Sequence, residues 1–412
     1  MKKLINTSTL NLFFRFLTLG AKFLLTTFVI KYISIEDFGI YKIITNTLAL
    51  AIYLLGLDFY TFSQRDILQG DDEEQGSKIK DQFTFYFASY ILFLPLMLIV
   101  FYFDKLDWQY VFWFYSILIL DHFSQELYRI LLVFKKSVIA SILFFIKAGL
   151  WVFPLFALWY FDEASERTLH IVLLFWLIGT VVSILFGLYF FIKLPFTINF
   201  KEKTDWKWIR KGLKVCIPFF FGTIAYKVIE FSDIYMIQHY YSETQVGIYG
   251  WFVGMGNMVE IFVQSAILIV FAPKLVEAFS KDKLEFKRLH KEMSIQNIVA
   301  SIGFGIAIII ALYPLVKFLD KAELVENYNL IYLLVGAKVV FNISMIYHYI
   351  LYVAHKDRLI IFSSVIAAIA NVVLNLILIP IYGIYGAAIA TFVSFSTIFV
   401  LKFIFARRLK IE

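Results

Sequence analysis

About twelve runs of roughly 20 apolar residues are the feature that most constrains this chain, because a helix of that length crosses the hydrocarbon core of a bilayer. The chain is 61% hydrophobic and only 17% charged, which leaves too little polar surface for a water-soluble protein of this size. We therefore predict an all-α polytopic membrane protein. The expected spans are 10–32, 39–60, 82–103, 109–133, 138–160, 169–192, 213–238, 248–272, 294–315, 329–353, 359–380 and 383–405.

The distribution of Lys and Arg predicts the orientation. An even number of spans places both termini on one side, and most Lys and Arg outside the spans fall on that side, in connections such as 61–81, 193–212 and 273–293. The positive-inside rule then predicts that both termini are cytoplasmic. Membrane anchoring explains these cations without nucleic-acid binding. The outer connections are too short to hold an active site, so we expect no enzymatic activity.

Two matching segments indicate an internal duplication. Residues 31–41 read KYISIEDFGIY and residues 239–249 read HYYSETQVGIY, and each segment lies between the first and second expected span of its half. We therefore expect two six-helix bundles, 1–192 and 213–412, joined by a cytoplasmic linker at 193–212. Both halves enter the membrane from the same side, which predicts a pseudo-two-fold axis along the membrane normal.

Four lysines lie deep inside the apolar runs: Lys22, Lys147, Lys227 and Lys338. A lysine at the bilayer centre costs about 2.5–3.5 kcal/mol and is tolerated where it faces a polar interior. Arg15 shares a helix face with Lys22. For Lys22, Lys147 and Lys338 no carboxylate lies within one turn on the same span, so we expect them to line a hydrated cavity for an anionic cargo.

Acidic residues occur in the same runs. Lys227 and Glu230 are three residues apart, as are Glu126 and Arg129, and this spacing favours structural ion pairs. Glu260 stands alone near the middle of its span, where a proton or sodium site and a tertiary salt bridge both remain possible interpretations. No phosphate-binding loop, zinc motif or catalytic triad is found, so no cofactor or metal is expected. The candidate residues for a coupling ion are Glu230, Asp233 and Glu260.

Three segments resemble the bacterial polysaccharide flippases, which are the O-antigen and capsule exporters of the multidrug/oligosaccharidyl-lipid/polysaccharide exporter superfamily. Residues 374–394, LNLILIPIYGIYGAAIATFVS, are similar to the last hairpin of that family. Residues 32–41 are similar to its first outer loop, and residues 272–275 to the segment after its eighth span. The small residues in the hairpin suit close helix packing.

This resemblance implies two six-helix bundles around a central cavity and alternating access. It implies transport of a polyprenyl-pyrophosphate-linked oligosaccharide to the outer leaflet for cell-surface polysaccharide biosynthesis such as that of O-antigen, part of lipopolysaccharide, or capsule. The expected partners are this lipid-linked cargo, membrane lipid and a possible coupling H⁺ or Na⁺. The residues expected to bind the pyrophosphate, assigned by helix face, are Arg15, Lys22, Lys147, Lys227 and Lys338.

Three other functions remain open at this point. A multidrug exporter of the same fold would carry cations and should show an acidic cavity, whereas lysine predominates here. A lipid-linked peptidoglycan precursor flippase has similar physical requirements but would tend to carry two more helices. A membrane polysaccharide polymerase or ligase would need a larger outer loop for its chemistry.

Overall fold

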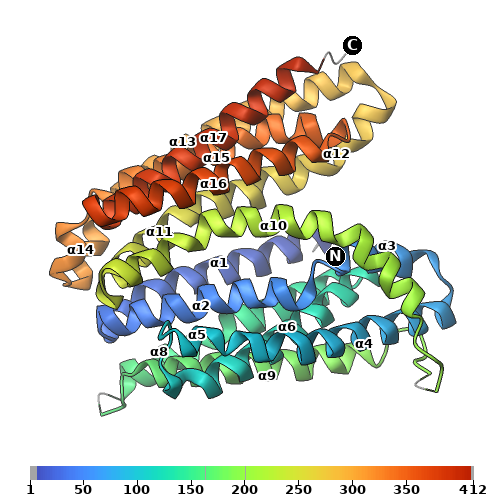
Figure 1. Cartoon of the computed structure of the whole chain (residues 1–412), viewed down its shortest axis with the longest axis horizontal. Coiled ribbons are helices and arrows are strands. Elements are labelled where there is room, and N and C mark those ends of the chain that lie inside the picture. Colours follow the sequence, from blue (N-terminus) through green and yellow to red (C-terminus); the bar gives the residue numbers. More distant parts are fainter. Residues whose placement is uncertain (1–6, 163, 200, 410–412) are drawn as a thin grey trace, which may run out of the picture. The chain divides into compact units, whose positions relative to one another are not determined.

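A computed structural model describes residues 7–162, 164–199 and 201–409, and within these ranges all regular secondary structure is helical (Figure 1). Contacts within the chain define two compact units. Unit 1 comprises residues 1–33 and 43–221, and unit 2 comprises residues 34–42 and 222–412. The division after residue 221 lies inside α10, so the predicted bundle limits at 192 and 213 stay predictions.

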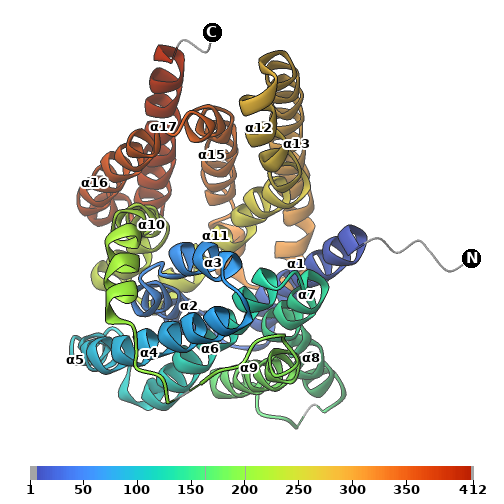
Figure 2. The ribbon, with the colours of Figure 1, turned by 90° about the vertical axis from the view of Figure 1, so that its right-hand side faces the viewer.

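Unit 1 contains the helices of the first half. They are α1 (Thr7–Tyr32), most of α2 (Ile35–Gly56), α3 (Tyr60–Gln69), α4 (Asp72–Met97), α5 (Ile99–Tyr102), α6 (Val111–Val133), α7 (Ser137–Phe145), α8 (Val152–Phe161), α9 (Leu169–Phe191) and the start of α10 (Trp206–Tyr240). A 3₁₀ turn, Trp108–Tyr110, precedes α6, and a π-helical turn, Ile146–Leu150, joins α7 to α8. Helices α6 and α9 pack against each other (Figure 2).

Unit 2 contains the start of α2, the rest of α10 and all later helices. These are α11 (Glu243–Val263), α12 (Ile269–Lys281), α13 (Lys283–Leu319), α14 (Ala322–Glu326), α15 (Leu330–Val353), α16 (Asp357–Tyr382) and α17 (Ile384–Arg408). A second π-helical turn, Gln264–Leu268, joins α11 to α12. Helix α17 packs along both α15 and α16 (Figures 1 and 2).

The predicted spans coincide with helices. Among the described residues, 11 helical segments are long and apolar enough to cross a membrane. The remaining predicted span, 109–133, is the 23-residue helix α6, which carries Asp121, His122 and Glu126 in its second half. The all-α polytopic prediction is therefore confirmed. Helices α10 and α13 extend past their apolar runs at both ends.

Side-chain caps mark where several helices begin. The Ser34 hydroxyl accepts a hydrogen bond from the Asp37 amide at 2.9 Å, and the Ser242 hydroxyl accepts one from the Gln245 amide at 3.4 Å. These serines are equivalent in the two matching segments and cap α2 and α11. Such a cap satisfies a backbone donor that the helix leaves without a partner. Helix capping therefore explains why both matching segments carry a serine at this position.

Close helix packing explains why both matching segments carry a glycine at the equivalent position. Gly39 on α2 and Gly247 on α11 meet where the two helix starts cross, both within unit 2. A Cβ atom on Gly39 would collide with the Glu243 carbonyl, and one on Gly247 would collide with the Ile35 carbonyl. The contact is reciprocal, because Ile35 and Glu243 are also equivalent positions in the two segments. Only glycine permits this approach of two backbones.

The last hairpin also depends on glycine. Gly383 connects α16 to α17 with a positive φ of 58°, a conformation that side chains disfavour. A Cβ atom on Gly386 would collide with the Leu378 carbonyl, so the first turn of α17 packs directly on the end of α16. Near the start of α10, Trp208 is buried against Phe59 and Phe62 of unit 1.

Candidate functional site

Unit 1 holds a cluster of three charged side chains on α1, α6 and the first π-helical turn. Lys147 lies in that turn and donates to the Asp121 carboxylate at 3.0 Å. Lys22 lies close enough to both to interact electrostatically, and its ammonium is 5.6 Å from the centre of the Phe144 ring. No ion pair involves Lys22 within the described ranges. The three groups carry two positive charges and one negative charge, so one positive charge is left over.

Arg15 lies on the same face of α1, two turns before Lys22, and is half-buried. Asn11, one turn earlier, accepts a hydrogen bond from Ser141 at 3.0 Å and donates to Ser137 at 3.1 Å, both on α7. These hydrogen bonds hold the start of this face of α1 against α7. The first turn of this face therefore contacts α7, and Arg15 and Lys22 lie further along the same face.

A second buried network in unit 1 is structural. Arg129 pairs with Glu126, as the spacing predicted, and lies 3.6 Å above the Tyr60 ring. Glu126 is fully buried and also accepts hydrogen bonds from Gln82 at 2.9 Å and Tyr86 at 2.8 Å. Every charge in this network is matched by hydrogen bonds, which is the condition for a stable buried ion pair. Both charges of this network are therefore already satisfied within the protein.

In unit 2, four charged side chains from three helices form one ion cluster. Lys227 donates to Glu230 at 2.6 Å, both on α10. Lys338 on α15 bridges Glu230 at 3.3 Å and Glu260 on α11 at 2.7 Å. The Tyr226 hydroxyl donates to Glu260 at 3.1 Å. Two ammonium groups meet two carboxylates, so the cluster is neutral.

Asp233 lies further along α10 in a different environment. It is 2% exposed and accepts hydrogen bonds from the Tyr249 hydroxyl, from Thr391 at 2.8 Å and from Asn375 at 3.3 Å. No salt bridge within the structurally described part of the chain involves Asp233. The Asn375 amide nitrogen faces this carboxylate, and the Asn375 side-chain oxygen is buried without a hydrogen-bond partner.

Asp233 and the side chains bonded to it contain carboxylate, amide and hydroxyl oxygens. Asn371 accepts hydrogen bonds from Ser232 at 2.8 Å and from Asn375 at 3.0 Å, which extends this hydrogen-bond network. Carboxylate, amide and hydroxyl oxygens are the donors that hard cations prefer. A buried carboxylate without a basic partner is costly unless a proton or cation joins it.

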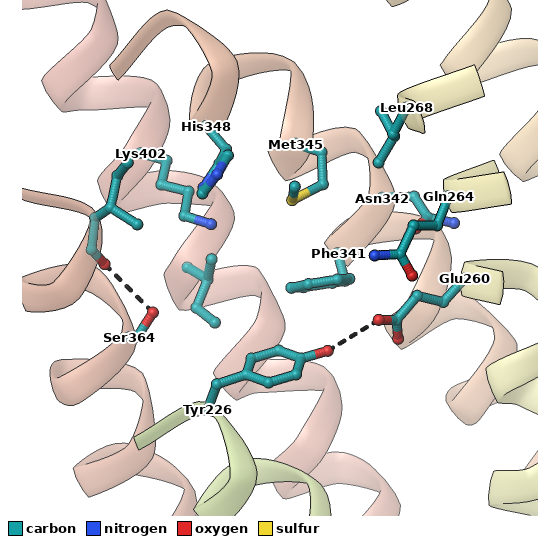
Figure 3. A pocket seen from close by; sticks show the side chains of 12 residues that line it. Tyr226, Glu260, Gln264, Leu268, Phe341, Asn342, Met345, His348, Ser364 and Lys402 are labelled. Atoms are coloured by element: carbon teal, nitrogen blue, oxygen red, sulfur yellow. Dashed lines mark hydrogen bonds between the residues drawn. The ribbon is translucent and has the colours of Figure 1, made fainter. Parts of the chain in front are cut away.

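Unit 2 also contains a cavity of about 250 Å³ between α10, α11, α15, α16 and α17. Figure 3 shows Lys402 and His348 at one end, Glu260 and Gln264 at the other, and the rings of Tyr226 and Phe341 between them. Lys402 is 3% exposed, and its ammonium makes no hydrogen bond or ion pair with any residue that the structure describes. The His348 Nδ1 atom is buried without a hydrogen-bond partner.

The structure corrects one part of the sequence interpretation. Lys147 and Lys338 have no carboxylate within one turn on their own spans and were expected to line a hydrated cavity. Instead, Asp121, Glu230 and Glu260 reach them from other helices and form ion pairs with them. The search along a single span could not find such partners. The pairing of Lys227 with Glu230 is confirmed. For Glu260, the tertiary salt bridge is observed.

Two features were missed from the sequence. Lys402 lies in the last apolar run, where the reasoning applied to the other lysines would have found it. The grouping of Asp233 with Tyr249 and Thr391 needed the packing of α10, α11 and α17, which no local pattern provides. Asn371 and Asn375 lie one turn apart on one face of α16, and this spacing is the only local signal.

Solved structures share this fold. The chain matches an inward-facing multidrug resistance MATE family transporter of the MOP superfamily with a TM-score of 0.75 and 11% identity, covering 98% of this chain and 95% of that one. It matches lipid II flippase MurJ in an inward closed conformation with a TM-score of 0.73 and 14% identity, covering 97% and 87%. A third match is the MATE multidrug transporter DinF-BH, with a TM-score of 0.70, 15% identity and coverage of 97% and 94%.

The fold and its charged interior define a multi-pass membrane protein with the architecture of these transporters. The family model described as "Polysaccharide biosynthesis protein" matches residues 5–279, well over half of the chain. The chain therefore belongs to the polysaccharide biosynthesis protein family. A search of curated proteins gave no match.

Proposed function

We propose that this protein is a flippase that moves a polyprenyl-pyrophosphate-linked oligosaccharide from the cytoplasmic to the outer leaflet of the bacterial inner membrane. The observation that carries the proposal is the membership of the polysaccharide biosynthesis family. The likeness of the fold to lipid II flippase MurJ supports it, because that protein is named for moving a lipid-linked precursor. The cargo would serve O-antigen, capsule or a similar surface polysaccharide.

We propose different roles for the predicted cations of the two units. In unit 1, Asp121 pairs with Lys147 and lies near Lys22, and Arg15 lies on the same face of α1 as Lys22, so we assign to these three cations the positive charge available for a pyrophosphate. Lys227 and Lys338 are neutralised by Glu230 and Glu260 and would reach a phosphate only by leaving those carboxylates. We place the main anion contacts in unit 1.

The movement of the cargo would follow from alternating access. An inside-negative potential favours outward movement of anions by about 2.3 kcal/mol per charge per 100 mV. A coupling H⁺ or Na⁺ would add to this drive. Asp233 is the strongest of the three coupling candidates, because Glu230 and Glu260 already have ammonium partners whereas Asp233 has only neutral donors. Both termini are placed in the cytoplasm in this scheme.

A transport assay tests the proposal. The purified protein would be reconstituted in proteoliposomes with a fluorescent lipid-linked oligosaccharide, and the appearance of label in the opposite leaflet would be followed. We expect the double variant Lys22→Gln/Lys147→Gln to lower the rate about tenfold, because charge-assisted contacts to phosphate are lost. Lys281→Gln is the matched control, since Lys281 is exposed and pairs only with Glu277 on the surface. An unchanged rate in the double variant would reject the unit 1 anion site.

A multidrug exporter is the second candidate, because two of the three solved structures above are multidrug transporters. Drug susceptibility of a strain that lacks the protein separates the two functions. Raised susceptibility to cationic drugs together with normal surface polysaccharide would favour drug export. Loss of surface polysaccharide with normal drug tolerance would favour the flippase.

A further inference from the structure

The cavity of unit 2 contains a buried lysine, Lys402, that has no acidic partner among the described residues. Glu260 at one end is paired with Lys338 at 2.7 Å and receives a hydrogen bond from Tyr226, so its charge is accounted for. Lys402 at the other end has no carboxylate partner within the described ranges. The centre of the Phe341 ring lies 6.0 Å from the Lys402 ammonium. At this distance the ring offsets the free-energy cost of burying the ammonium only weakly. The cavity therefore favours an occupant with one negative charge.

Polar side chains that line the cavity with Lys402 have atoms free to bond the same anionic occupant. His348 has a buried Nδ1 atom without a hydrogen-bond partner, and its ring lies next to the Lys402 ammonium (Figure 3). The side-chain amide of Gln264 points toward the cavity from the other side. Buried polar atoms without partners are rare in native proteins, and those in a cavity are commonly completed by a ligand or water.

The walls of the cavity are mostly apolar and aromatic. The Tyr226 and Phe341 rings lie 5.3 Å apart with an interplanar angle of 35°, and Ile398 and Leu268 complete the walls. Ring faces of this kind fit the C–H face of a sugar, while amide and imidazole groups bond its hydroxyls. A volume of about 250 Å³ has room for a single sugar unit, below the range of drug-sized ligands.

We infer that this cavity is a subsite for an acidic sugar of the cargo, with the sugar carboxylate on Lys402 and the sugar ring against Phe341 and Tyr226. One ammonium neutralises one carboxylate. The pyrophosphate of the lipid carrier bears more negative charge and matches the cationic group of unit 1 better. This inference rests on the proposed function, and it adds that the cargo head group contains a uronic-acid-type residue.

Binding to the purified full-length protein tests the subsite directly. Thermal unfolding would be measured with sodium glucuronate, glucose or sodium acetate at equal concentration and ionic strength. We expect glucuronate to raise the melting temperature more than either of the others. Lys402→Met should weaken glucuronate binding about tenfold, because a hydrogen-bonded charge pair is lost. Lys402→Arg should retain most of it. Arg407→Gln, which removes an exposed positive charge from the same helix, is the control.

A transport comparison then separates the subsite from the proposed function. Two lipid-linked oligosaccharides that differ only in a C6 carboxylate or hydroxymethyl group would be offered to proteoliposomes. We expect faster transport of the acidic form, and Lys402→Met should remove the preference. Equal transport of both forms, or an equal effect of acetate and glucuronate on stability, would overturn the subsite and leave the flippase intact. Transport of neither form would count against the flippase, and glucuronate binding would still report on the cavity.

Discussion

At the scale of single residues, the buried charges of unit 2 are distributed among helices rather than along one helix. Lys338 bridges two carboxylates that come from α10 and α11, so it links three helices through one ammonium. Removing one partner of a buried ion pair leaves an uncompensated charge, which costs about 3–5 kcal/mol. The ion cluster therefore holds the three helices together and also neutralises its own charges.

This bridging role gives a prediction for Lys338. We expect Lys338→Met to lower the free energy of unfolding by about 3 kcal/mol, because Glu260 loses its basic partner. The double variant Lys338→Met/Glu260→Gln should recover most of the loss, because the stranded charge is gone. Chemical denaturation of the purified protein in detergent measures both. A double variant that is no more stable than the single one would show that the ion pair is not the cause.

Asp233 gives a second prediction at this scale. If a cation completes its oxygen group, sodium chloride should raise the melting temperature of the wild-type protein above that in choline chloride at equal ionic strength, by mass action. Asp233→Asn should abolish this difference and any dependence of transport on an ion gradient. Glu277→Gln, at an exposed carboxylate, is the control. Gradient-dependent transport that survives in Asp233→Asn would exclude this residue from coupling.

At the scale of helices, the crossing of α2 and α11 limits how each helix can be changed. The two helix starts are so close at Gly39 and Gly247 that backbone atoms occupy the positions of the missing Cβ atoms. A carbonyl in a helix cannot move aside as a flexible side chain can. The helices must separate if either glycine gains a side chain.

We therefore expect Gly39→Ala and Gly247→Ala each to destabilise the protein by about 1–3 kcal/mol, as overpacking generally does. The matched controls are Gly20→Ala and Gly303→Ala, because nothing lies within 4 Å of a Cβ atom at these two helical glycines. The controls should be neutral or slightly stabilising, since alanine favours helix. Thermal unfolding of the four purified variants measures the difference, and equal effects in all four would refute the packing argument.

At the scale of the whole molecule, the orientation can be tested with reporter fusions. Alkaline phosphatase fused after Ser165, between α8 and α9, should be active because that connection is expected outside. The same reporter fused after Asp282, between α12 and α13, should be inactive because that connection is expected in the cytoplasm. The opposite pattern would invert the topology and, with it, the proposed direction of transport.

The helices could be predicted from the sequence because each span satisfies its own backbone hydrogen bonds, so apolar length alone indicates a span. Helix α6 was also predicted, although it carries Asp121, Glu126 and Arg129. Ser34 and Gly39 recur at the equivalent positions of the second matching segment, and this repeat could be seen in the sequence. The helix caps explain the serines, and the crossing of α2 and α11 explains the glycines.

The partners of the buried charges could not be predicted in the same way. An i,i+3 pair such as Lys227 and Glu230 is set by helix geometry and can be found from spacing. Lys147 and Asp121 are 26 positions apart, and Lys338 and Glu260 are 78 apart, so their pairing depends on which helix faces are in contact. The same limit applies to Asp233 and Thr391, and to the cavity around Lys402.

The reciprocal contact of Gly39 and Gly247 bears on the origin of the chain. Each glycine meets the carbonyl at the equivalent place on the opposite copy of one short motif, which is the geometry of a self-complementary interface between identical subunits. If the two matching segments reflect the predicted duplication, an ancestral six-span polypeptide would already have possessed the patch needed to associate with a second molecule of itself. Fusion of two such molecules would have preserved that patch and left the remaining surfaces free to diverge.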